Sequence, residues 1–219
     1  MSAKPARRRV RGEPSRKQLM DAAIDCFARL GYQGTTIDRI ARDAGVTKGA
    51  LYYHFKDKEE LLFAAVKDRV GEFEQQVLAE VTPDQDPMEA LRHVVDACFR
   101  HATMSNHRRF IITLMVEALD TNPRLSAEFR SILRRMRVFL GRIVRQGQQR
   151  GALRADVSPE AAAASIAGAI MGAEIQHYQD PEQIDLRAAL DSLLEQVAGW
   201  LAPPAGSTGI AISGGTKSW

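Results

Sequence analysis

The sequence has few cysteines and no long apolar run, and each shortage excludes a class of protein. Its two cysteines, Cys26 and Cys98, cannot form a disulfide framework and fit a reducing compartment. The longest stretch of small apolar residues, 161–173, is interrupted by Ser165 and is shorter than the ~20 residues that cross a bilayer. No apolar run follows the basic residues 7–9 to make a signal peptide. We therefore expect a cytoplasmic protein with no membrane partner.

Motifs of enzyme chemistry are missing as well. The chain has no glycine-rich phosphate loop, no nucleophile elbow and no His-Glu-x-x-His helix, so we predict no catalytic residue, no cofactor and no enzymatic activity. Cys98 and His101 are three residues apart, with His107 nearby, and this spacing leaves a metal-sensing regulator open as an alternative. Because an apolar cysteine and surface histidines explain the same residues, we assign no metal site.

The sequence does have a strongly asymmetric charge. Residues 1–58 carry 13 Lys and Arg against 6 Asp and Glu, a net charge of +7, whereas the remainder carries 17 against 21, a net charge of −4. A basic front part favours a polyanionic partner, because neutralised phosphates release their counterions. Double-stranded DNA is such a partner.

Apolar residues recur with a helical period along nearly the whole chain from Ser15 to Leu201, and no stretch alternates like a strand. The sequence therefore predicts an all-α fold of about nine helices. The expected helices lie at about 15–30, 35–44, 47–55, 88–104, 107–120, 123–150, 159–178 and 186–201. A long fourth helix is expected to open near Asp57, and its apolar stripe is Leu62, Val66, Val70, Phe73 and Val77. Gly31 is expected to end the first helix in the left-handed conformation. Capping boxes are expected at Thr35 with Asp38 and at Asp57 with Glu60.

Residues 37–56 have the spacing of a helix-turn-helix. Ala41 in the fifth place lets two helices approach, Gly45 in the ninth makes the turn, and Leu51 in the fifteenth fills the wedge between them. Taken alone, the pattern also fits an ordinary helical hairpin.

The residues around this pattern closely resemble the TetR family of bacterial transcriptional regulators. The resemblance rests on GTTIDRIA at residues 34–41, on AGVTKGALYYHFKDKEEL at residues 44–61, and on Ala22, Ala23, Phe27, Leu30, Gly31 and Tyr32 upstream. It is specific over residues 15–64 and only architectural beyond them. It implies a ligand-responsive regulator, expected to be a repressor, that binds a palindromic operator as a dimer and is released by a small-molecule inducer.

With this resemblance, the chain is expected to have four parts. Residues 1–14 are a disordered basic arm, 15–60 a helix-turn-helix DNA-binding domain, 61–201 a helical ligand-binding and dimerisation domain, and 202–219 a disordered tail. The small residues of the helix at about 159–178 and the apolar residues of the helix at about 186–201 are expected to join two subunits, and packing within one chain is the alternative. The apolar residues of the second helix are Leu190, Leu193, Leu194, Val197, Trp200 and Leu201.

The helix expected at 47–55 offers hydroxyl, ammonium and imidazole groups to phosphates and base edges in a major groove. Lys48 and Lys56 are the predicted phosphate contacts. Gly49 lets the backbone approach DNA closely, which explains a glycine that otherwise costs about 1 kcal/mol in a helix. Tyr52 and Tyr53 either contact DNA or belong partly to the core. The predicted DNA contacts are Thr36, Thr47, Lys48, Gly49, Tyr52, Tyr53, His54 and Lys56.

Flexible Met and Phe side chains with a few polar groups on the middle helices suit an apolar pocket for an unidentified inducer. For each of them, ordinary core packing is the alternative. The predicted ligand contacts are Phe99, Met104, Phe110, Met115, Met136, Glu174 and His177. For the protein as a whole, a sequence-independent architectural DNA-binding protein is the other alternative, which the acidic body and the single compact motif disfavour.

Overall fold

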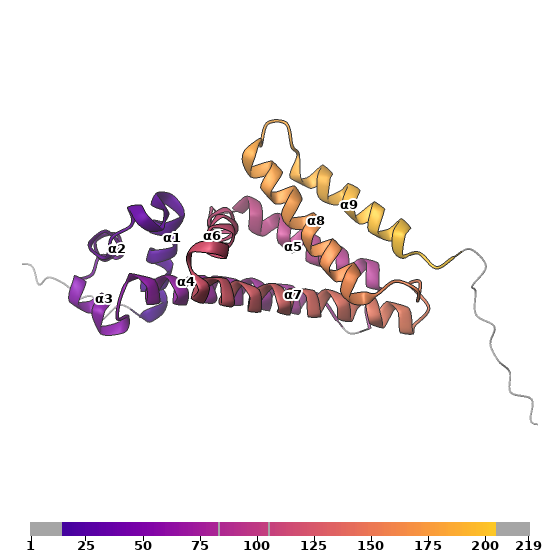
Figure 1. Ribbon diagram of the computed structural model, residues 1–219, viewed down its shortest axis with the longest axis horizontal. Coiled ribbons are helices and arrows are strands. Elements are labelled where there is room, and N and C mark those ends of the chain that lie inside the picture. Colours follow the sequence, from indigo (N-terminus) through magenta and orange to yellow (C-terminus); the bar gives the residue numbers. More distant parts are fainter. Residues whose placement is uncertain (1–14, 83, 105, 205–219) are drawn as a thin grey trace, which may run out of the picture. The chain divides into compact units, whose positions relative to one another are not determined.

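The computed structural model describes residues 15–82, 84–104 and 106–204. Its regular elements within these ranges are all helices, which confirms the all-α prediction (Figure 1). They are α1 (Arg16–Gly34), α2 (Ile37–Ala44), α3 (Lys48–His54), α4 (Lys58–Glu80), α5 (Pro87–Met104), α6 (His107–Thr121), α7 (Pro123–Gln149), α8 (Pro159–Gln179) and α9 (Leu186–Leu201). The basic arm at 1–14 and residues 205–219 of the predicted tail lie outside the described residues.

The helices form two compact units. The N-terminal unit contains the described residues 15–72 and 106–116, and the C-terminal unit contains the described residues 73–104 and 117–204. The long helix α4 and the shorter helix α6 therefore each contribute residues to both units. The domain limits expected from the sequence, 15–60 and 61–201, stay predictions.

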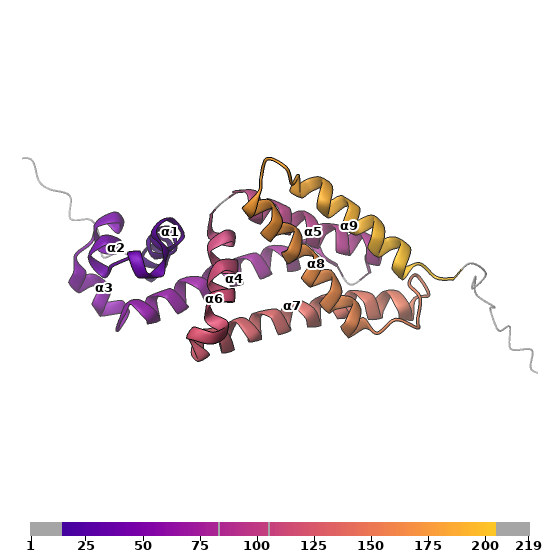
Figure 2. The same cartoon turned by 45° about the horizontal axis from the view of Figure 1, so that its top comes forward.

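In the N-terminal unit, α1 packs against α2, and α2 packs against α3 (Figure 2). The apolar stripe of α1 is buried, and Phe27 is at its centre. The ring of Phe27 stacks on that of Phe110 from α6, with 6.1 Å between centroids and 8° between planes. A stacked aromatic pair of this kind adds about 0.5–1.5 kcal/mol beyond the burial of its area. The core of this unit is thus completed by a helix more than seventy residues further along the chain.

The two ends of α1 follow local sequence signals with one difference from expectation. Ser15 caps the helix, and its hydroxyl and the Gln18 side chain form a reciprocal capping box. Gly31 has a positive φ of 71°, as expected, but its ψ of 168° is not that of a left-handed helical cap. The helix continues for one more turn after Gly31 and ends at Gly34.

The expected capping box at Thr35 is wrong, because the structure buries Thr35 and uses its neighbour instead. The Thr35 hydroxyl donates to the carbonyls of Gly31 at 2.7 Å and Cys26 at 3.2 Å. Thr36 caps α2, and its hydroxyl accepts from the backbone N–H of Arg39. At α4, Asp57 accepts from the N–H of Glu60 as predicted, but Glu60 accepts from the N–H of Lys56 and not from that of Asp57.

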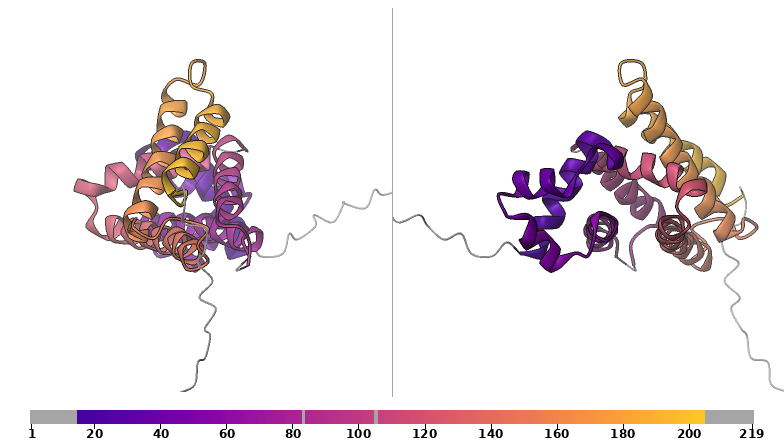
Figure 3. Two further views of the ribbon diagram at one scale, coloured as in Figure 1. Left: turned by 90° about the vertical axis from the view of Figure 1, so that its right-hand side faces the viewer. Right: turned by 60° about the vertical axis from the view of Figure 1, so that its left-hand side comes forward.

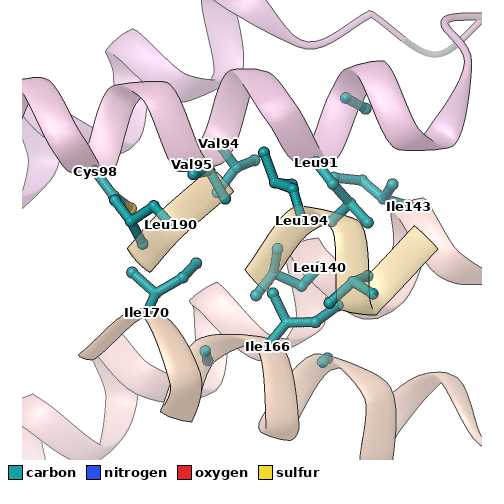
Figure 4. Close-up of a cluster of buried hydrophobic side chains, with 14 of the residues drawn as sticks. Leu91, Val94, Val95, Cys98, Leu140, Ile143, Ile166, Ile170, Leu190 and Leu194 are labelled. Carbon is teal, nitrogen blue, oxygen red and sulfur yellow. The ribbon is translucent and has the colours of Figure 1, made fainter. Parts of the chain in front are cut away.

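The C-terminal unit is built around a cluster of buried aliphatic side chains contributed mainly by α5, α7, α8 and α9 (Figure 4). The helices α8 and α9 lie side by side, as both views of Figure 3 show. Asn122 and Ser158 cap α7 and α8 ahead of a proline, as the sequence predicts. Close packing inside this unit requires Gly147, because a Cβ there would lie 2.6 Å from Cδ1 of Leu153. Within the described ranges, no helix has both the length and the apolar character needed to cross a bilayer.

Candidate nucleic-acid interface

A left-handed residue sets the turn between α2 and α3. Gly45 has φ 69° and ψ 31°, a conformation that glycine adopts without steric cost. Its N–H donates to the carbonyls of Ala41 and Arg42, and the next N–H, from Val46, returns to the Ala41 carbonyl at 2.9 Å. The wedge between the helices is filled by Ile40 and Leu51, which are buried. The helix-turn-helix predicted from the spacing is therefore present, with its glycine and its buried residues in the expected roles.

One face of α3 presents the predicted DNA contacts to solvent. Tyr53 is 81% exposed and Tyr52 is 49% exposed, which disfavours the alternative that these rings belong to the core. His54 is half-buried, with its ring edge-on to that of Tyr53 at 5.0 Å. Lys56 is exposed just beyond the helix. The residues Thr47, Lys48, Gly49, Tyr52 and Tyr53 thus form one open face that carries hydroxyl and ammonium groups.

Two of the predicted contacts also hold helix ends. The hydroxyls of Thr36 and Thr47 accept from the N–H groups of Arg39 and Ala50 at the starts of α2 and α3. Each hydroxyl keeps its own hydrogen, which can be donated to a phosphate oxygen.

Gly49 has no packing reason to be glycine. A Cβ at this position would have one neighbour within 4 Å, Oγ1 of Thr47 at 3.8 Å, which is an ordinary contact. Its φ is not in the positive range that favours glycine. Since neither space nor backbone conformation demands glycine in the free protein, the reason expected from the sequence, a close approach to DNA, stays a prediction.

Sequence reasoning missed the carboxylates that hold the basic side chains of this unit. Lys48 Nζ donates to Oδ2 of Asp38 at 3.0 Å, and this hydrogen bond raises the pKa of Lys48. Asp43 accepts from Arg39 at 3.1 Å and from Arg29 at 2.6 Å. No local signal could have found these pairs, except Arg39 with Asp43, which has the i, i+4 spacing of a helical ion pair.

Asp43 is also tied to the core by a buried thiol. Cys26 Sγ lies 3.3 Å from Oδ2 of Asp43. The pKa of Asp43 is lowered by the hydrogen bonds that Cys26 and the neighbouring guanidinium groups donate to it. Burial and the hydrogen bond to Asp43 together raise the pKa of Cys26 to about 11. Cys26 is therefore a neutral structural thiol at neutral pH.

Lys58 is a second residue that the sequence analysis did not single out. Its Nζ donates to the carbonyls of Tyr32 at 2.9 Å and Thr35 at 3.0 Å, and lies 4.1 Å from the centre of the Tyr32 ring. These bonds satisfy the carbonyls where α1 ends and α2 is about to begin. Lys58, at the start of α4, thus holds the segment between α1 and α2 that leads into the helix-turn-helix.

The predicted ligand contacts have several different environments. Phe110 and Met115 are buried in the N-terminal unit, Phe110 by its stack on Phe27. Met104 is 81% exposed. Phe110 and Met115 thus lie in the core of the N-terminal unit and Met104 faces solvent, and a ligand-binding role for these three stays a prediction.

The other four predicted ligand contacts lie, like Met104, in the C-terminal unit. Glu174 is fully buried, and Phe99 and Met136 pack partly buried against the aliphatic cluster. Phe99 also lies under the guanidinium of Arg187, 5.2 Å from its ring centre. His177 Nδ1 lies 2.8 Å from the carbonyl of Ile184 and so holds the loop between α8 and α9. A role for these four in ligand binding stays a prediction.

The residues of the metal-sensing alternative have other partners. The His101 ring packs against Phe73 at 4.9 Å, and His107 Nε2 lies 2.6 Å from Oδ1 of Asp25. Among the residues that the structure describes, no group of three His, Cys, Asp or Glu side chains could hold a metal ion.

The small residues expected at a dimer interface are exposed on α8, whereas most of the apolar residues expected there on α9 are buried. The exposed residues of α8 include a continuous series of small side chains, Ala161, Ala164, Ser165, Gly168 and Ala169. A Cβ at Gly168 or Gly172 would meet nothing within 4 Å. On α9, an interface role is wrong for Leu190, Leu194, Val197 and Leu201, because all four are buried in the core of their own chain. Trp200 remains 39% exposed, and Leu193 is half-buried.

Comparison with known proteins covers both units. The sequence matches the family model described as bacterial regulatory proteins, tetR family, over residues 19–65. It matches the model described as tetracyclin repressor-like, C-terminal domain, over residues 87–179.

Individual relatives extend these matches along the chain. The fatty acid metabolism regulator protein of Bacillus subtilis (strain 168) is 26% identical over 182 residues, which are 83% of this chain and 93% of the relative. The HTH-type transcriptional repressor AcnR of Corynebacterium glutamicum is 31% identical over 140 residues, 62% of this chain and 69% of the relative. The crystal structure of the regulator FadR from Bacillus subtilis in complex with stearoyl-CoA is 26% identical, with a TM-score of 0.74 over 84% of this chain and 98% of that one.

Proposed function

This chain belongs to the tetR family of bacterial regulatory proteins, and we propose that it is a repressor that binds a palindromic operator as a dimer and leaves it when a small molecule binds. The relatives that match it are named as regulators, in agreement with the expectation that it is no enzyme. We include the expected cytoplasmic location in this proposal because the proposed target is chromosomal DNA.

The observation that carries the proposal is the open face of α3. A left-handed glycine turn holds α3 against α2, and α3 then exposes an ammonium, two phenol rings and a glycine whose Cβ position is empty. Such a face fits a major groove, in which Lys48 and Lys56 neutralise phosphates while Tyr52 and His54 reach base edges.

Selection of bound sequences from a random DNA pool tests this function. Two recognition helices about 34–36 Å apart read half-sites one helical turn apart, so we expect an enriched inverted repeat with that spacing. Lys48→Ala should weaken binding to all sequences and reduce the salt dependence, whereas changes at Tyr52 or His54 should alter base preference. If no sequence is enriched over random DNA at matched salt, the architectural alternative replaces operator reading.

The small-residue face of α8, together with the exposed Trp200 of α9, is the surface we propose for dimerisation. Side chains as small as these let helix backbones approach closely, and α8 and α9 of two subunits would make a two-fold interface of four helices. Gly168→Arg introduces a long cation where a Cβ now meets nothing. We expect this variant to sediment as a folded monomer and to lose the two-half-site complex. Unchanged dimerisation would move the interface elsewhere.

We propose that the inducer is an amphipathic molecule bound in the C-terminal unit near Phe99, Met136 and the buried Glu174. The relative of known structure was solved with stearoyl-CoA, which makes a long-chain acyl-CoA the first probe. We expect it to release the selected operator, because a ligand shifts the population toward the state that it binds more tightly. Binding without any change in operator affinity would exclude this acyl-CoA as the inducer.

A further inference from the structure

The ion pair between Asp38 and Lys48 joins the two helices of the DNA-reading motif. Lys48 Nζ and Asp38 Oδ2 are 3.0 Å apart, and the side chains are 51% and 61% exposed. Asp38 lies in the first turn of α2, and Lys48 is the first residue of α3. A predicted phosphate contact is therefore already bound to an anionic oxygen in the free protein.

The second carboxylate of α2, that of Asp43, is held by several hydrogen bonds and serves as a comparison. Asp43 is only 27% exposed and accepts from Arg39, Arg29 and the buried thiol of Cys26. Asp38 is bound by Lys48 alone among the side chains that the structure describes. One carboxylate is thus anchored from several sides, and the other is attached by a single exposed contact that can exchange.

A DNA phosphate offers Lys48 the same kind of acceptor that Asp38 offers. An ammonium group donates equally to carboxylate and phosphate oxygens, and exposed ion pairs contribute little because water competes for both charges. An approaching phosphate can therefore replace Asp38 at a small cost, while the carboxylate repels any phosphate that does not reach Lys48.

We propose that Asp38 sets the affinity of this protein for DNA: its carboxylate occupies Lys48 in the free protein and gives way to a phosphate when DNA binds. The proposal rests on the function proposed above for α3. Because the contact exchanged is with the phosphate backbone, Asp38 scales the affinity for every sequence by the same factor and leaves base preference unchanged.

A purely structural role for Asp38 makes the opposite prediction. A negative charge in the first turn of a helix is favourable with the helix dipole, so Asp38→Asn is expected to lower stability slightly in either case. If stabilising α2 were its only role, loss of the charge would leave DNA affinity unchanged or reduce it. If Asp38 occupies Lys48, the same variant binds DNA more tightly although it is less stable.

Fluorescence anisotropy with a duplex of random sequence at fixed salt tests the proposal. We expect Asp38→Asn to bind about two- to fivefold more tightly than the wild type, the range that an exposed ion pair allows. Asp25→Asn is the matched control, because Asp25 is 63% exposed in the same unit and pairs with His107. It removes the same charge without freeing Lys48, so its affinity is expected to stay unchanged. In a Lys48→Ala background, Asp38→Asn should give no gain.

Each other outcome is decisive. Equal or weaker binding by Asp38→Asn overturns the proposal, and so does the same gain in Asp25→Asn or in the Lys48→Ala background, since that gain is only the loss of a repelling charge. If the wild type binds no duplex and selection enriches no sequence, the proposed function fails and this inference falls with it. If the wild type binds and Lys48→Ala weakens it but Asp38→Asn does not strengthen it, the inference alone fails.

Discussion

Replacing Gly49 by alanine is expected to stabilise the free protein and to weaken its DNA complex. A Cβ at this position meets Oγ1 of Thr47 at 3.8 Å and nothing nearer, so the methyl group creates no strain. Alanine is favoured over glycine within helices by about 1 kcal/mol, and for the second residue of α3 we expect a gain of about 0.5–1 kcal/mol. Urea unfolding followed by circular dichroism at one fixed protein concentration measures this gain.

The affinity of the same variant is expected to change in the opposite direction. If the backbone of α3 lies against the DNA at Gly49, a methyl group separates the two surfaces, and we expect at least a tenfold loss of operator affinity, about 1.4 kcal/mol. Gly71→Ala is the control, because a Cβ there, in α4, meets nothing within 4 Å and so creates no strain either. It should gain similar stability at unchanged affinity. Operator binding by Gly49→Ala within about twofold of the wild type would refute a close approach at this residue.

Three further changes test the packing and the buried groups. Gly147→Ala should lower the free energy of unfolding by about 1–3 kcal/mol, since its methyl group overlaps Leu153. A free energy of unfolding in urea above that of the wild type would contradict this. Because the pKa of Cys26 is raised to about 11, the contribution of its thiol to stability should be full below about pH 9 and fall as the pH approaches 11. Urea midpoints measured across that range should show this fall in the wild type and not in Cys26→Ala. Lys58→Met leaves the Thr35 carbonyl without its donor, whereas the Tyr32 carbonyl keeps the N–H of Thr35. The variant should cost about 1–3 kcal/mol by the same assay, and an unchanged midpoint would show that water replaces the ammonium.

Local signals in the sequence predicted the turns and most helix ends. Gly45 was assigned to the turn because its neighbours have the spacing of two packed helices, and its left-handed conformation confirms this. The caps at Asn122 and Ser158 follow from adjacent residues as well, since each is a good N-cap followed by a proline that suits the first helical turn. Such features depend on a few consecutive residues, so the rest of the fold does not change them.

The errors occurred where packing between helices decides between choices that are equivalent in the local sequence. Thr35 and Thr36 are both good caps, and Thr36 takes the role because Thr35 is buried against carbonyls of α1. Likewise, the stripe of leucines on α9 indicates that one face is buried, but not whether its own chain or a partner buries it. Here α5 and α8 of the same chain pack against α9.

Helix α6 contributes residues to both units, and this limits where a protein of this architecture can be divided into fragments. The first ten or so residues of α6 belong to the N-terminal unit, and Phe110 supplies half of its aromatic stack. A fragment cut after α4 would therefore carry a vacancy beside Phe27 and expose the apolar side chains around it. Chimeras that exchange DNA-binding units between regulators of this architecture should graft residues 107–116 of α6 together with α1, α2, α3 and α4 up to Glu72, and the junctions for such grafts lie inside helices and not in loops.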